Sequence, residues 1–119
     1  MSEAEAVALI IAEARAEGDS VLALVRAGAD PGAERMHRLV SALAVVYHAL
    51  GGRAEIDRKL AGALFALGSD VPLTISSLAN KGHVWRKEFM ETEVYELLVG
   101  VQSIFDDREF EADASETVH

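Results

Sequence analysis

The sequence contains no cysteine, only 2 prolines and few aromatic residues, with 1 Trp, 2 Tyr and 4 Phe among 119 positions. The lack of cysteine excludes disulfide frameworks, thiolate zinc sites, iron–sulfur clusters and thiol nucleophiles. Because nothing indicates an oxidising compartment, we expect a cytoplasmic protein. A domain of this length buries roughly two-thirds of the surface that its unfolded chain exposes, so it can form a core without disulfide or metal staples.

Basic residues are also scarce, because 11 Lys and Arg stand against 20 Asp and Glu, which gives a net charge of −9. This charge disfavours direct nucleic-acid binding, which depends on clustered positive charge and counterion release. Six of the acids lie in residues 106–119, where Arg108 is the only base. Low hydrophobicity and high charge predict that residues 106–119 form a disordered acidic tail.

Targeting and membrane signals are not evident either. The chain opens with Ser2, Glu3 and Glu5, where a secretory signal would carry basic residues. No apolar run approaches the roughly 20 residues that a membrane-spanning helix needs. We therefore expect a soluble protein without membrane contact.

The residues that are abundant favour helices. Ala, Leu and Glu dominate the composition, and alternating strand patterns are almost absent. We therefore predict an all-α fold, a compact single-domain bundle of five or six helices over residues 1–105 with the acidic tail after it. No period of 20–50 residues recurs, which disfavours a repeat array.

Three helices are predicted in the first half of the chain. Ser2 and Glu5 form a capping-box pattern that begins a helix at residues 3–17, and Asp19 or Ser20 caps a short helix that stops at Gly28. Asp30 and Pro31 then begin a central helix over residues 31–50. Its apolar residues follow helical spacing, namely Met36, Leu39, Val40, Leu43, Val46, Tyr47 and Leu50.

The second half predicts two or three more helices. One runs from about residue 54 to 67 and ends at Gly68, and Pro72 opens a short helix that stops at residues 80–82. Helical spacing returns at residues 84–105. This last segment is either one long helix or two, with a break or bend near Glu91 and Thr92.

No motif in the chain predicts catalysis. Glu34 and His37 have the spacing of half a di-iron site, but the body of the chain holds no second such pair. His37 and His48 share a helical face yet lie roughly 16 Å apart along it, so they cannot ligate one metal ion. No nucleophile elbow or glycine-rich phosphate loop is present. We therefore expect a protein that is not an enzyme, with no catalytic, metal or cofactor-binding residues.

The segment 81–87 concentrates bases around the only tryptophan. Trp85, Arg86 and Lys87 have the composition of an interface hot spot. The alternative is that Trp85 fills the core while the two bases are solvated. Together with the acids Glu55 and Asp57, these three residues are the candidate partner-binding residues of the sequence.

These features favour a protein that acts by binding another protein. It would be an inhibitor, an immunity or antitoxin-like regulator or an assembly subunit, and the acidic charge favours a basic partner such as a nuclease or a nucleic-acid-binding machine. Two alternatives stay open. One is a small helical-bundle enzyme or a protein that binds a metal or small ligand, and the other is a self-associating structural module, a homo-oligomer.

Overall fold

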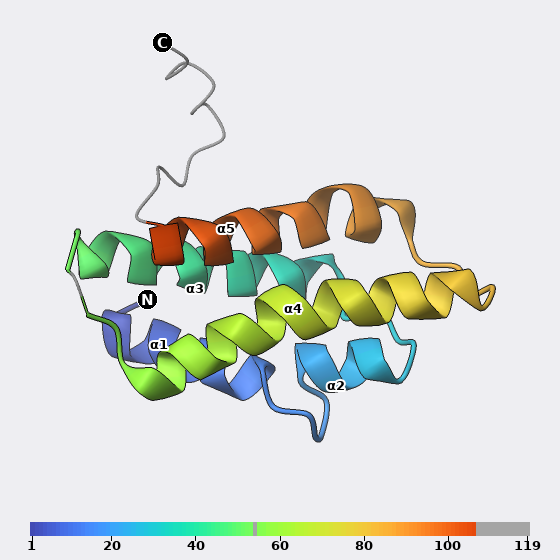
Figure 1. Ribbon diagram of the computed structural model, residues 1–119, viewed down its shortest axis with the longest axis horizontal. Helices are drawn as coiled ribbons and strands as arrows, with labels where there is room; N and C mark the ends of the chain where they lie inside the picture. The colour runs from blue at the N-terminus through green and yellow to red at the C-terminus, as the bar shows by residue number, and fades with distance from the viewer. Residues whose placement is uncertain (54, 107–119) are drawn as a thin grey trace, which may run out of the picture.

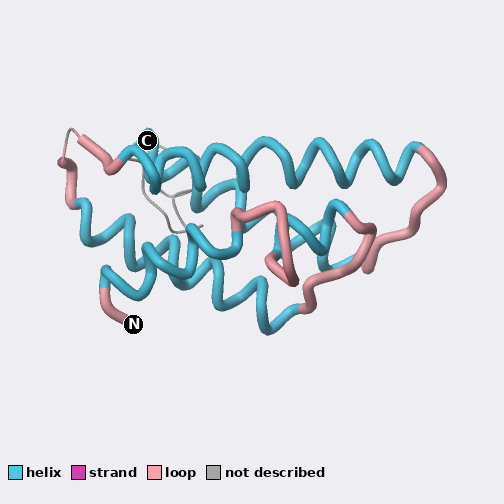
Figure 2. The backbone as a smooth tube through the Cα atoms, turned by 90° about the horizontal axis from the view of Figure 1, so that it is seen from below, coloured by secondary structure: helices cyan, strands magenta, loops and turns pink. Residues whose placement is uncertain are grey.

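The computed structural model describes residues 1–53 and 55–106, and these form a bundle of helices without strands (Figures 1 and 2). The all-α prediction is therefore confirmed. The helical elements are α1 (Glu3–Glu13), α2 (Val21–Arg26), α3 (Ala33–Leu50), α4 (Arg58–Asn80), the π-helical turn η1 (Phe89–Glu93) and α5 (Val94–Asp106). Apart from Asp106, which ends α5, the predicted tail lies outside the described residues.

Helix α3 forms the centre of the bundle, as its apolar pattern predicts. It packs against α1 and α5, whereas α4 packs against α5, α1 and α2 (Figure 1). Leu39, Leu43 and Val46 of α3 are fully buried. Since α4 and α5 lie side by side at one edge of the bundle and run in opposite directions, each turns one side toward the core and the other outward.

The helix starts in the first half depend on polar contacts. The capping box of Ser2 and Glu5 is present, and Ser20 caps α2. Helix α1 ends at Glu13 rather than at residue 17, and the buried Glu13 carboxylate accepts a hydrogen bond from the Val21 backbone N–H at 3.0 Å. Glu13 thereby joins the end of α1 to the start of α2.

Helix α3 begins two residues later than predicted. Its N-cap is Gly32, whose φ of 94° lies in a region that favours glycine. The carboxylate of Asp30 accepts a hydrogen bond from the Gly32 N–H at 2.8 Å, and it also binds Arg86. Asp30 is therefore a turn residue that joins two parts of the fold rather than the cap of α3.

The predicted break between Gly68 and Pro72 is wrong, because α4 continues through both residues to Asn80. At Gly68 a Cβ atom would lie 3.0 Å from Cγ1 of Val101, so the glycine allows close packing of α5 instead of ending α4. Pro72 removes one backbone donor from the helix. The burial of Val71 and Ile75 on the core side offsets that loss.

The last helical segment is continuous but irregular. Residues 87–106 are helical throughout, and the π-helical turn η1 interrupts the α-helical geometry at Phe89–Glu93. The predicted irregularity near Glu91 and Thr92 thus falls inside η1. Residues 84–86 precede the helix rather than beginning it.

Candidate interaction surface

Trp85 lies in the core rather than on the surface. Its side chain is 6% exposed and packs against the rings of His83 and Phe89, with centroid distances of 4.4 and 5.4 Å. The indole N–H finds no hydrogen-bond partner among the described residues. Trp85 therefore offers a partner little contact area in this conformation.

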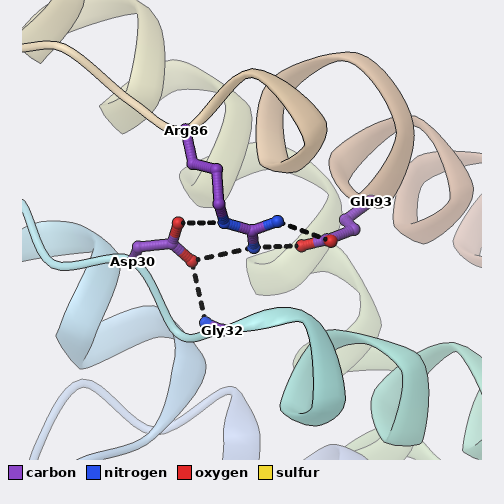
Figure 3. Close-up of polar contacts among 4 residues, drawn as sticks. All are labelled: Asp30, Gly32, Arg86 and Glu93. Atoms are coloured by element: carbon purple, nitrogen blue, oxygen red, sulfur yellow. Dashed lines mark hydrogen bonds and ion pairs between the residues drawn. The ribbon is translucent and has the colours of Figure 1, made fainter.

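Arg86 is engaged within the protein (Figure 3). Its Nε donates to Asp30 at 2.7 Å, and its Nη1 and Nη2 donate to the buried carboxylate of Glu93 at 2.9 and 2.7 Å. These hydrogen bonds raise the pKa of Arg86 above its ordinary value, and the bond from Arg86 lowers the pKa of Asp30. Arg86 therefore ties the loop before α3 to η1, and its donors are not free for a partner.

The other three candidate residues are Lys87, next to Arg86, and the two acids Glu55 and Asp57. Lys87 and Glu55 are exposed, and the carboxylate of Asp57 accepts a hydrogen bond from the Leu60 N–H at 3.1 Å, which caps α4. Residues 55–57 precede α4 and residues 85–87 follow it, and a helix of 23 residues is roughly 35 Å long. The candidates of the sequence therefore do not form one site.

A different surface has the features of an interface. In the part of the chain that the structure describes, seven large apolar side chains are exposed, and five of them lie on α4, η1 and α5. These five, with their exposed fractions, are Phe65 (69%), Leu73 (68%), Met90 (43%), Tyr95 (65%) and Phe105 (47%). We call this set the α4–α5 face.

A groove runs along this surface between the two helices. It has a volume of about 400 Å³ and is lined by Leu64, Phe65, Gly68 and Ser69 of α4 and by Leu98, Val101, Gln102 and Phe105 of α5. None of these lining residues is charged. Because Gly68 has no side chain, Val101 approaches the backbone of α4 at the floor of the groove.

The outward side of α4 is almost free of charge. Between Leu60 and Asn80 the only charged residue is Asp70, which pairs with Arg26 at 3.1 Å. Helix α4 is also the one described helix that is long and apolar enough to span a membrane. Of the 18-residue stretch that meets this condition, 33% is buried inside the protein. Soluble proteins have core helices that satisfy the same criteria, so this finding alone does not place α4 in a membrane.

A second, more polar cavity lies elsewhere, between α1, the loop that follows it and α3, and three of its charged side chains pair with one another. It has a volume of about 540 Å³ and is bordered by three acids and three arginines, including Glu13, Asp19 and Arg35. Arg35 contacts Glu13 at 2.8 Å and Asp19 at 3.7 Å, and the bond to Glu13 raises the pKa of Arg35. In residues 1–53 and 55–106, no three His, Asp or Glu side chains gather as a metal ion would require.

No family model, curated protein or solved structure matches the chain. The physical features of the α4–α5 face therefore carry the functional argument. A signal for this face exists in the sequence, namely the run of 21 residues from Leu60 to Asn80 with a single charge. The predicted break at Gly68 divided that run into two short core helices.

Proposed function

We propose that this protein acts by binding another protein chain through the α4–α5 face. The observation that carries the proposal is the uncharged groove between α4 and α5, at which the exposed Phe65 and Phe105 lie. An aromatic side chain has about 150–250 Å² of surface, so the five exposures correspond to roughly 500 Å². Exposed apolar surface of about 300–600 Å² on a monomer is often functional, which supports an interaction site here.

The chemistry of the groove favours a protein over a small polar ligand. Small-molecule sites place several convergent polar groups among apolar walls. Here only Ser69 and Gln102 contribute polar side chains, and the Ser69 hydroxyl already donates to the Phe65 carbonyl oxygen at 3.0 Å. An apolar side chain on a partner helix suits such a groove better, because helix-in-groove recognition relies on apolar anchors.

Photo-crosslinking in the native cell tests the proposal. A photoreactive amino acid replaces Gln102, which is exposed at the groove, or His37, which is exposed on α3 and serves as the control. We expect a discrete crosslinked protein product, of this chain or another, from position 102 and not from position 37. Equal products from both positions, or none from position 102, would contradict the proposal.

The net charge of −9 supports a second, separate proposal, that a partner carries a basic surface, as a nuclease blocked by this protein would. Association with such a partner should slow steeply as salt rises from about 0.05 to 0.5 M. The substitution Glu55→Lys should also lower the rate of association with such a partner. Because Asp57 caps α4, its reversal would alter stability as well as charge, so Glu55 is the better position for this test. An association rate that is independent of salt would exclude this mechanism.

A further inference from the structure

We propose that the chain covering the α4–α5 face is a second copy of this protein, in a two-fold dimer whose α4 helices run antiparallel. This inference rests on the proposed function, because it names the partner of the same face. The structure supplies three independent arguments for a second copy, from shape, charge and area.

The shape of the face is self-complementary. A two-fold interface brings one patch against itself, so the patch must carry both a projection and a recess. Leu73 projects and is 68% exposed, and the groove on the same helix is lined by Phe65, Gly68 and Ser69. A two-fold axis at Ser69 lies midway between Phe65 and Leu73, so Leu73 of each copy would meet Phe65 at the groove of the other.

The charges favour contact on such a face. Two copies that each carry −9 repel each other wherever their acids approach. The outward side of α4 holds no unpaired charge between Leu60 and Asn80, so an interface can bury it without leaving a charged group unpaired.

The area is sufficient for an interface. The roughly 500 Å² of exposed apolar side chain on each copy gives about 1,000 Å² for two copies, before the walls of the groove are counted. Specific interfaces begin at about this total area. A single partner helix would cover the groove but leave Leu73 or Tyr95 exposed, whereas a second copy of the whole face covers both.

The first experiment is sedimentation equilibrium of the full chain between about 1 and 100 µM, at an ionic strength of about 0.15 M, which screens the net charge. We expect a mass of twice 12.8 kDa at the upper concentrations. Phe65→Glu should raise the dissociation constant at least tenfold, and His37→Glu on the exposed side of α3 should leave it unchanged. Circular dichroism of Phe65→Glu at low concentration checks that the helices persist.

Disulfide trapping tests the antiparallel arrangement of the two α4 helices. The sequence has no native cysteine, so only the introduced thiols can react. Ser69→Cys places two thiols at the proposed axis, within the short Cα separation that a disulfide needs. Ser76→Cys places its two copies about 20 Å apart along antiparallel helices. We therefore expect rapid dimer formation under mild oxidation from position 69, and slow formation from position 76 and from the control Ser41→Cys on α3.

Several results would overturn the inference. These are a monomeric protein at 100 µM, a dimer that survives Phe65→Glu, or faster trapping at position 76 or 41 than at position 69. If the protein is monomeric but position 102 still crosslinks to a different protein, the proposed function stands and only the identity of the partner is wrong. Flotation with phosphatidylcholine vesicles that is lost in Phe65→Glu would assign the face to a membrane and overturn both proposals.

Discussion

Helices α3 and α4 bury similar apolar stripes but differ on their outward sides. The exposed positions of α3 include Glu34, His37 and Arg38, whereas those of α4 include Phe65 and Leu73. The buried stripes determine how the helices pack, and they look alike in both. The difference lies in residues that the fold does not require, so the outward side of α4 between Leu60 and Asn80, where Asp70 is the only charge, is the feature that needs a functional explanation.

A leucine-to-alanine substitution in each helix should give the largest difference in stability, because one leucine is buried and the other is exposed. Leu43→Ala in α3 removes a fully buried side chain and should lower the free energy of unfolding by about 2–5 kcal/mol. Leu73→Ala in α4 removes a side chain that is 68% exposed and should change the stability of the monomer by less than about 0.5 kcal/mol. Urea denaturation at several protein concentrations measures both values and separates folding from association. A near-neutral Leu43→Ala would show that the central stripe is not core.

A smaller difference in stability should appear between alanine variants of the neighbouring residues Arg86 and Lys87. Arg86→Ala leaves the carboxylate of Glu93, which is 2% exposed, without its cation and should lower the free energy of unfolding clearly more than Lys87→Ala does. Lys87→Ala on the surface should change stability by less than about 0.5 kcal/mol. Thermal or urea unfolding of the two variants checks the difference. Equal effects would mean that the contacts of Arg86 add nothing to the folded state.

The sequence predicts elements whose signals are local. The capping box at Ser2, the cap at Ser20 and the central stripe of α3 each lie within a few turns of one helix, and the structure contains all three. The break at Gly68 is wrong because the closest neighbour of that glycine is Val101, 33 residues away. The unbroken spacing of Leu60, Leu64, Leu67, Val71 and Ile75 across the same region was the better guide.

The candidate site was harder to predict, for a related reason. Arg86 lies 56 residues from Asp30, and no local pattern reveals that the two are paired. Phe65 follows the buried Leu64 directly, and on a helix a step of one residue turns the side chain by about 100°. The composition of α4 shows that it is apolar, but only the packing of α5 on one side shows which apolar residues remain exposed.

The two acids before α4 offer a finer comparison. Asp57 accepts the Leu60 N–H and caps α4, whereas Glu55 is exposed. Asp57→Ala should therefore lower the free energy of unfolding by about 1 kcal/mol, and Glu55→Ala by less than half as much. Urea denaturation of the two variants tests this. A larger effect at Glu55 would show that charge, rather than capping, is what the start of α4 requires.

The smallest expected effect is a pH dependence at Asp30. The hydrogen bond from Arg86 lowers the pKa of Asp30 below its ordinary value of 3.8, so near that pH the unfolded state binds more protons than the native state. The stabilisation is therefore complete above about pH 5 and is lost as the pH falls through the lowered pKa. The difference in unfolding free energy between the native sequence and Asp30→Asn should shrink below about pH 4, and in the Arg86→Ala background it should vary much less with pH. A difference that stays constant from pH 7 to pH 3 would show that the Arg86 bond does not hold the Asp30 carboxylate ionised.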